Sequence, residues 1–422
     1  MNNIKKFEWA IVGSGIAGII TSEILTREGH EVVLIEKNDK LASETTRNFH
    51  EWMHAGSLFT LIPDKLRTLK FILGAIDDLF EYYGSFNRMN LKPTEKGLDV
   101  RECNYGWFNK KNHIFFKFRI KGRKSTFPWL IGVARAIFLI NKIKEHDWLR
   151  RRAGVFDPFK YRIKDIWEII KELVKHKDKF YVVKTPDFTM NSRNILNDII
   201  SKAVDNGLEI STSNKILEYE KTEEGFLIKG ERESFIVEKI ALCNGGNITD
   251  FVKNTTVKKS YAPMAVIDNI NENSKSFVEL DYYPKNCINI ITKENNIGLV
   301  GGISFNNEAK CEEYINEVIE KHKIYQPQIR VLKKYNGVKS EVILKGEPRN
   351  YLFHIKEVEK DIWMVIPGKF TLGFSIGPEF YRRVYHKNPK KYFNMENNYK
   401  KNKFISNTVW KDVYINKINR RK

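Results

Sequence analysis

Two short stretches of the chain contain residues whose types and spacing could do chemistry. In the first, HEWMH, the residues His50, Glu51 and His54 have the spacing of a zinc metalloprotease helix. Two histidines one helical turn apart can ligate a single Zn²⁺, and the glutamate between them polarises the bound water. So short a pattern also arises by chance, and the sequence indicates no third ligand on a following helix. We therefore expect no metal site, and zinc chemistry stays open as the minor alternative.

The second stretch is rich in glycine and follows an apolar strand that we expect over residues 7–12. Gly13 permits a tight turn, Gly15 lets the backbone approach a pyrophosphate, and Gly18 lets a helix pack closely on the strand. The N-terminus of that helix faces the phosphates with free N–H groups and the positive end of its dipole. This stretch predicts a dinucleotide site made by Gly13, Ser14, Gly15, Ile16, Ala17 and Gly18.

The residues after the glycine stretch complete a βαβ unit. The helical pattern runs to Glu28, a turn follows at Gly29 and His30, and a second strand ends at Glu36. An acid at the end of this strand is placed to accept hydrogen bonds from ribose hydroxyl groups. Strand, helix, strand and acid occur in the right order, so the whole unit is a far more specific signal than its glycines alone.

Length and composition bound the class of protein. The 422 residues are enough for two structural domains, and 42% hydrophobic with 13% aromatic residues is typical of a folded chain. The four cysteines lie far apart without C-x-x-C spacing, which predicts neither a disulfide framework nor a cysteine zinc site. No signal peptide is expected, because the first apolar run has the form of a strand and a glycine turn. No membrane span is expected either, because no uncharged stretch reaches the required length. A cytoplasmic protein fits these features.

Most of the net charge of +20 lies in two segments. Residues 109–152 hold 13 Lys or Arg against Glu145 and Asp147, a net charge of +11. Residues 386–422 hold 11 Lys or Arg against Glu396 and Asp412, a net charge of +9. Such segments indicate an anionic partner, among which we expect a phosphorylated substrate or lipid headgroups on the inner face of a membrane rather than nucleic acid. Compositional drift in a chain rich in Asn and Ile is the other explanation.

The segment that follows Glu36, LASETTRNFHEWMHAGSL, resembles the corresponding segment in FAD enzymes of the D-amino-acid-oxidase superfamily. In those enzymes a turn rich in Thr and Ser leads to a His-Ala-Gly or similar element beside the flavin. The resemblance implies FAD as the cofactor, with Lys37, Thr45, Thr46 and His54 among the residues that contact it. It also places His54 near the isoalloxazine ring and leaves a covalent attachment of flavin at this histidine open.

Later stretches are similar to the same superfamily in the same order. A helix is expected from Asn191, a hairpin turns at residues 223–225, and an apolar strand over residues 240–243 runs into Asn244 and Gly245. In the relatives this strand returns a glycine turn to the cofactor. The resemblance therefore implies cofactor contacts at Asn244 and Gly245, and a backbone contact with adenine near Ile216.

The C-terminal part resembles glycerol-3-phosphate dehydrogenases more narrowly. Their Gly-Val-Arg-Pro, Arg-Asp-Tyr and Gly-Lys-Leu-Thr elements correspond to Lys339, Arg349 and residues 368–371 here. The resemblance implies that Lys339 and Arg349 bind an anionic group of the substrate. Lys339 is followed by Ser340 rather than Pro, and Lys lacks the planar fork of Arg, so glycerol phosphate itself is in doubt. A strand ending at Gly368 and a helix beginning near Pro378 would bring cofactor contacts from Gly368, Lys369, Phe370 and Thr371.

The βαβ unit predicts an α/β fold, and the resemblance implies that a Rossmann-like FAD-binding domain is interleaved with a substrate domain built on an antiparallel sheet. Two helices are expected over residues 128–145 and 162–176, the first buried or lying in a membrane interface. The expected domains are residues 1–85, 181–255 and 346–390 for FAD binding, residues 86–180 for a basic helical insertion, residues 256–345 for the antiparallel sheet and residues 391–422 for a basic tail.

The predicted activity is hydride transfer to flavin N5 from a carbon that bears a hydroxyl group, or less favourably an amine, of a small anionic substrate. A base must take the proton of the heteroatom, and a histidine that titrates near neutrality suits this role. His54 and His354 are the candidates. Electrons would leave to oxygen, a quinone or a protein. The alternative hypothesis is a peripheral membrane or polyanion-binding protein in which FAD is structural.

Overall fold

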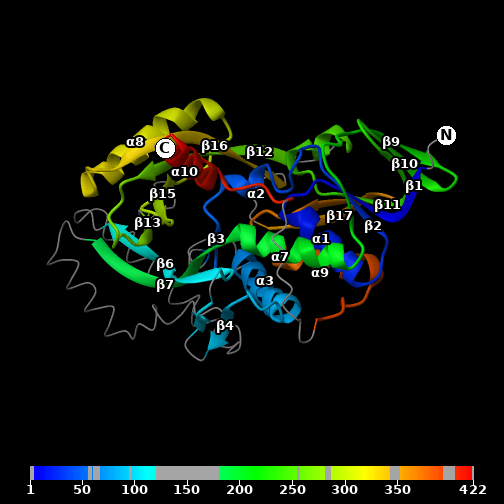
Figure 1. The fold of residues 1–422 in the computed structure, drawn as a ribbon, viewed down its shortest axis with the longest axis horizontal. Helices are drawn as coiled ribbons and strands as arrows, with labels where there is room; N and C mark the ends of the chain where they lie inside the picture. The colour runs from blue at the N-terminus through cyan, green and yellow to red at the C-terminus, as the bar shows by residue number, and fades with distance from the viewer. Residues whose placement is uncertain are drawn as a thin grey trace.

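The computed structural model describes residues 4–55, 59, 67–94, 97–103, 105–119, 180–253, 257–280, 287–342, 352–392 and 404–420. Two large sheets lie side by side in Figure 1, the first to the right with its helices and the second to the left. The first is mainly parallel and the second mainly antiparallel. The predicted fold class is confirmed.

The N-terminal βαβ unit forms the centre of the first sheet. Strand β1 (Lys5–Val12) and strand β2 (Val32–Ile35) pair in parallel, with helix α1 (Ile16–Arg27) between them. All residues of β2 and of α1 are buried, as expected for a parallel sheet covered on both faces. The strand ends directly before Glu36, where the sequence predicts it.

The remaining strands extend this sheet on both sides of β1. Its path is β17-β18-β11-β1-β2-β8, and a hairpin of β9 and β10 pairs with β11 outside that path. The hairpin turns between Thr222 and Gly225, as the sequence predicts. Strand β11 is longer than expected. The bounds are β8 (Glu209–Ser211), β9 (Ile216–Thr222), β10 (Gly225–Gly230), β11 (Ser234–Leu242), β17 (His354–Glu359) and β18 (Ile362–Ile366).

Helix α9 (Gly373–Tyr385) begins earlier than the start near Pro378 that the sequence suggests, so that expectation is wrong. The proline lies inside the helix, where neighbouring contacts outweigh the loss of its N–H. Two glycines of α9 make close packing on α1 possible. A Cβ on Gly373 would lie 2.6 Å from Ile16 Cγ1, and a Cβ on Gly377 would lie 2.8 Å from the Ile20 carbonyl oxygen.

We expect Gly377→Ala to lower the free energy of unfolding by about 1–3 kcal/mol, because the added methyl group meets backbone that cannot move aside. The matched control is Gly74→Ala in helix α3 (Arg67–Tyr83), where a Cβ would meet nothing within 4 Å. Alanine there should be neutral or stabilise by up to about 1 kcal/mol. Urea unfolding of both variants measures the difference, and equal midpoints would show that the α1–α9 contact is looser than described.

Helices α1, α7 (Ser192–Asp205), α9 and α3 share one core on the first sheet. In Figure 1 these helices lie together below the sheet. Asn191 caps α7 by accepting a hydrogen bond from the N–H of Asn194, so the helix begins where the sequence predicts it.

The second sheet has the order β16-β12-β15-β14-β13-β6-β7-β3. Side chains alternate along β12, so Ala265 and Ile267 face helix α8 (Cys311–Tyr325), whereas Met264 and Val266 face helix α10 (Val409–Asn419). The bounds are β3 (Trp52–Met53), β6 (Phe108–Arg119), β7 (Phe180–Met190), β12 (Val257–Asp268), β13 (Ser276–Leu280), β14 (Ile288–Thr292), β15 (Gly298–Gly301) and β16 (Arg330–Val342). A separate hairpin consists of β4 (Leu91–Thr94) and β5 (Gly97–Val100).

The two basic segments have different outcomes. The helices expected over residues 128–145 and 162–176 lie outside the described residues. The end of the chain, expected as a basic tail, contains α10, whose Val409, Trp410, Val413 and Tyr414 pack on the second sheet. In the part of the chain that the structure describes, no helix combines the length and the apolar character needed to cross a membrane.

Candidate functional site

The glycine turn after β1 forms a cradle at the N-terminus of α1. Gly13 has φ +97°, and a Cβ on Gly18 would lie only 1.9 Å from the Gly13 carbonyl oxygen. Helix and turn can therefore approach this closely only because both positions lack a side chain. Among the described residues, a Cβ on Gly15 would meet one atom within 4 Å, Thr46 Oγ1 at 3.4 Å. The space over Gly15 is open, as an approaching pyrophosphate requires.

Glu36 is held beside this cradle. Its carboxylate accepts hydrogen bonds from the N–H of Ser14 at 3.0 Å and from the Ser14 hydroxyl group. The other carboxylate oxygen accepts from the N–H and the side-chain amide of Asn38. These bonds fix the acid at the end of β2, where it can face a ribose. Lys37 instead lies 3.1 Å from Glu44 at the surface.

The return strand β11 supplies a second wall of the cradle. The N–H of Cys243 donates to the Val12 carbonyl oxygen, which brings Asn244 and Gly245 to the glycine turn. A Cβ on Gly13 would lie 2.7 Å from Asn244 Cα. Asn244 Oδ1 is buried and has no hydrogen-bond partner among the described residues. Ile216 is buried at the start of β9 on this side of the sheet.

Taken together, these residues fit FAD. An open glycine cradle, an acid fixed at the ribose position and a buried amide oxygen without a protein partner are the features that a bound dinucleotide would complete. Thr46 completes the first turn of α1, because its hydroxyl oxygen accepts from the N–H of Ile16 at 3.1 Å. Thr45, by contrast, donates to the Val338 carbonyl oxygen of β16.

His54 lies where the two sheets meet. Its N–H donates to Thr371 Oγ1 at 3.0 Å, which connects β3 to the turn between β18 and α9. In that turn Gly368 has φ +65°, and the N–H of Lys369 donates to the Pro367 carbonyl oxygen. The His54 ring packs 4.4 Å from the Trp52 ring and edge to face on Phe59.

Asp187 is a site residue that sequence reasoning missed. This fully buried carboxylate of β7 accepts from Trp52 Nε1 at 3.0 Å and from the N–H of Ala55 at 2.8 Å. One of its oxygens lies 3.8 Å from His54 Nδ1. The carboxylate thus holds the Trp52 side chain and the Ala55 backbone on either side of His54, and it places a negative charge beside the His54 ring. No local sequence pattern identifies Asp187 as a site residue, because Trp52 and Ala55, its hydrogen-bond partners, lie more than 130 residues away in the sequence.

Two lysines add positive charge around this histidine. Lys369 Nζ lies 5.2 Å over the Phe59 ring, and Lys339 Nζ lies 4.7 Å over the Phe49 ring and 3.5 Å from Ser304 Oγ. Burial lowers the pKa of His54 to about 4, with Asp187 opposing the shift and the two lysines reinforcing it. The sequence suggests a histidine that titrates near neutrality, whereas in this environment His54 is neutral at pH 7.

The HEWMH stretch is not helical, so the zinc alternative lacks the geometry on which it depends. Glu51 has φ +58° and is followed by β3. The His50 ring fills the space beside Gly301, and burial together with Lys293 and Lys339 lowers the pKa of His50 to about 3. Within the described ranges no group of three or more His, Cys, Asp or Glu could hold a metal ion.

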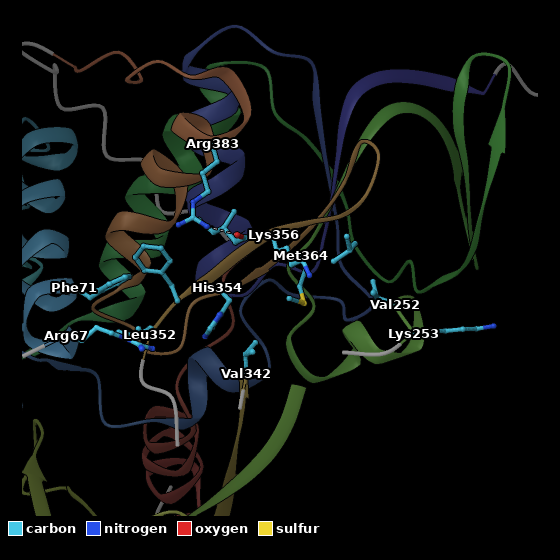
Figure 2. A pocket seen from close by; sticks show the side chains of 13 residues that line it. Arg67, Phe71, Val252, Lys253, Val342, Leu352, His354, Lys356, Met364 and Arg383 are labelled. Carbon is cyan, nitrogen blue, oxygen red and sulfur yellow. Dashed lines mark hydrogen bonds between the residues drawn. The ribbon is translucent and has the colours of Figure 1, made fainter. Parts of the chain in front are cut away.

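His354 lies in a different place from His54. It starts β17 and lines a cavity of about 750 Å³ with Arg67, Phe71, Val342 and Arg383 among its neighbours (Figure 2). His54, Lys339, Lys369 and Thr371 are not among the residues that line this cavity. The structure therefore brings four of the predicted site residues together and leaves His354 apart from them. Arg349 lies outside the described residues.

Comparisons with known proteins agree with this geometry. A sequence model of the family described as FAD dependent oxidoreductase matches residues 8–109. L-α-glycerophosphate oxidase from Mycoplasma pneumoniae with FAD bound is similar in structure, with a TM-score of 0.64, 15% identity, and coverage of 92% of this chain and 97% of that chain. Glycine oxidase from Geobacillus kaustophilus gives a TM-score of 0.61 at 12% identity, covering 91% and 96% of the two chains. L-amino acid deaminase from Proteus vulgaris gives 0.62 at 12% identity, covering 92% and 95%. A comparison with curated protein sequences finds no match.

FAD is the cofactor that the family match over residues 8–109 indicates, and the similar structures show the same fold over most of the chain. They do not confirm the narrower resemblance to glycerol-3-phosphate dehydrogenases, because the similar structures are named for glycerophosphate, glycine and amino acid substrates alike.

Proposed function

We propose that this protein is an FAD-dependent oxidoreductase that removes a hydride from a carbon bearing a hydroxyl group, or less favourably an amine, in a small anionic substrate. The observation that carries the proposal is a neutral histidine, His54, that lies beside the buried carboxylate of Asp187 and within the electrostatic influence of Lys339 and Lys369. FAD, when bound, supplies the hydride acceptor at its N5 atom. The chain itself must bind the anion, orient the substrate and take its proton.

His54 is the residue we assign to proton removal. With Nδ1 facing Asp187, the favoured tautomer carries its proton on Nδ1 and leaves Nε2 as the acceptor. When Nε2 takes the proton, the carboxylate of Asp187 stabilises the resulting imidazolium. Asp187 already acts in this sense, because it opposes the lowering of the pKa of His54 by burial.

An anionic substrate would make this base stronger at the moment it is needed. Lys339 and Lys369 both lower the pKa of His54 in the free protein. A carboxylate or phosphate placed between the lysines would offset their charge and raise the pKa of His54 toward neutrality, where a base is most effective. This coupling supports an anionic substrate independently of any sequence resemblance, and we assign Arg349 to the same anion.

Replacing Lys339 with methionine is expected to raise the KM for the anionic substrate about 10- to 100-fold, because a charge-assisted contact is worth about 1.5–3 kcal/mol. Lys339→Arg keeps the cation and should stay within about tenfold of the wild-type KM. Lys334→Met on the same strand is the control, since Lys334 Nζ donates to Asn316 Oδ1 at 2.6 Å on the exposed surface. Steady-state kinetics measures all three, and a wild-type KM in Lys339→Met would remove this lysine from the substrate site.

The experiment that tests the proposed function is anaerobic bleaching of the flavin absorbance by a panel of small hydroxy and amino acids and their phosphorylated counterparts. One anionic member of the panel should reduce the flavin, and the acceptor, whether oxygen, a quinone or a protein, follows from reoxidation of the same sample. Strong binding to anionic vesicles without bleaching by any compound would favour a structural FAD on a membrane surface and would overturn the proposal. We also propose that the protein acts in the cytoplasm.

A further inference from the structure

The end of the chain crosses the loop that connects the ribose acid to His54. We define this C-terminal strap as residues 404–419 and the cofactor loop as residues 41–51. The N–H of Leu41 donates to the Phe404 carbonyl oxygen at 2.8 Å, and the N–H of Ser406 donates to the Leu41 carbonyl oxygen at 3.0 Å. Ser406 Oγ also donates to the Ala42 carbonyl oxygen at 2.9 Å. The start of the cofactor loop thus pairs with the strap like a short strand.

A buried arginine joins the middle of the cofactor loop to the same strap. Arg193 Nη1 donates to the Ser406 carbonyl oxygen at 2.8 Å, and Arg193 Nη2 donates to the Thr46 carbonyl oxygen at 3.0 Å. Burial lowers the pKa of Arg193 to about 10, while Glu51 opposes the shift, so the guanidinium stays charged at pH 7. One charged side chain therefore connects three segments, α7, the strap and the loop.

Helix α10 fixes the end of the loop. Trp410 Nε1 donates to Glu51 Oε2 at 3.1 Å, and Asp412 pairs with Arg47. Glu51 also accepts from Lys293 Nζ at 2.6 Å and from the N–H of Ser192 at 2.9 Å. Burial acts to raise the pKa of Glu51, but Lys293 and Ser192 outweigh it and the pKa is lowered. The Glu51 carboxylate is therefore ionised, and it accepts hydrogen bonds from Trp410, Lys293 and Ser192.

The cofactor loop is the part of the chain that closes the glycine cradle. Its Thr46 hydroxyl group lies at the first turn of α1 and beside the open space over Gly15. The loop ends at Glu51, and the two residues of β3 connect it to His54. Figure 1 shows the red C-terminal segment passing beside α2 (Thr45–Asn48) before it turns into α10. Any loosening of the strap would release Thr46 from the cradle while the βαβ unit stayed intact.

We propose that the C-terminal strap holds the cofactor loop in its FAD-binding conformation, and that Trp410 and Asp412 are positioning residues for the cofactor. This inference rests on FAD as the cofactor and deepens the proposed function. Coupling between two binding events is reciprocal. If docking of the strap strengthens FAD binding by a given factor, bound FAD must strengthen docking of the strap by the same factor.

The test uses the full chain with Trp410→Phe, Asp412→Asn and the double variant. Phenylalanine keeps an aromatic ring on α10 and loses the hydrogen bond to the ionised Glu51. We expect the Kd of FAD, followed by quenching of flavin fluorescence, to rise about tenfold in each single variant, which corresponds to about 1.4 kcal/mol. Lys411→Gln is the control, because Lys411 lies on the same helix and next to the Trp410 ring but pairs with exposed Glu294, in the turn between β14 and β15.

A second measurement uses the wild-type protein and follows the reciprocal effect. Trypsin can cut at Lys411 and Lys417 within α10, and FAD at saturating concentration should slow these cuts about tenfold relative to cuts elsewhere. The proposed role of the strap would be wrong if the folded variants bound FAD with wild-type affinity. It would also be wrong if trypsin cut the wild-type protein in α10 at the same rate with and without FAD. If Trp410→Phe fails to fold, Asp412→Asn and the trypsin measurement still decide the question. A wild-type protein that takes up no FAD would instead defeat the cofactor assignment.

Discussion

Replacing His54 with asparagine is expected to slow flavin reduction about 10³-fold while FAD stays bound, because general base catalysis typically contributes 10²- to 10⁴-fold. Asparagine keeps a planar polar side chain against Trp52 and Phe59 but cannot take a proton. The measurement is the rate of absorbance loss after anaerobic mixing with substrate. His386→Asn is the matched control, since His386 is exposed and its φ of +55° suits asparagine. A wild-type rate in His54→Asn would move the base elsewhere, with His354 next to be replaced.

The pH dependence of the same reaction tests the electrostatic account. The pKa of His54 is lowered to about 4 in the free protein, and the neutral form is the active base. We therefore expect kcat/KM to stay level as pH falls from 8 to about 5, and to decline only near pH 4. The decline of kcat should occur at higher pH, because bound anion raises the pKa of the complex. A decline of kcat/KM near pH 6.5 would show an exposed histidine instead.

Asp187→Asn tests whether the buried carboxylate acts through His54. The variant keeps the size of the side chain and an oxygen for Trp52 or the N–H of Ala55, but it loses the charge that favours imidazolium. We expect it to shift the kcat profile to lower pH and to slow flavin reduction less than His54→Asn does. A slower rate with an unshifted profile would assign Asp187 a purely structural role.

Local patterns in the sequence predict the cofactor half of the molecule well. The βαβ unit, Glu36 and the hairpin after β9 each follow from a few consecutive residues, because turn chemistry and strand burial are local. The order of segments around the return strand β11 also follows from sequence. These features concern backbone conformation, where glycine and hydrophobic periodicity carry most of the information.

Long-range contacts account for what the sequence could not predict. Asp187 contacts Trp52 of β3 from the neighbouring strand β7, 135 residues away in the sequence, and Trp410 contacts Glu51 from helix α10. Long-range contacts also determine the conformation of HEWMH. Its spacing is that of a helix, but the pairing of β3 with β7 and the buried partners of Glu51 hold it in a non-helical conformation. The start of α9 shifts for a related reason, since contacts of two glycines with α1 outweigh the proline signal.

Gly15→Ala is expected to weaken FAD binding about 10- to 100-fold while leaving the apoprotein as stable as wild type. Gly15 has φ −66°, which alanine adopts without strain, and its Cβ would meet only Thr46 Oγ1 at 3.4 Å. The methyl group would instead occupy the open space where the pyrophosphate approaches, an overpacking cost of about 1–3 kcal/mol. Fluorescence titration gives the Kd, and thermal unfolding without FAD gives the stability.

Gly18→Ala should behave in the opposite way, and the contrast separates the fold from the cofactor. Its Cβ would lie 1.9 Å from the Gly13 carbonyl oxygen, a backbone atom of a turn already fixed at φ +97°. Turn and helix must therefore separate even without FAD, so the apoprotein itself should lose stability. If Gly15→Ala bound FAD like wild type, the open space over Gly15 would not hold the pyrophosphate. If both variants lost stability alike, the cradle would be part of the core rather than a site built for a ligand.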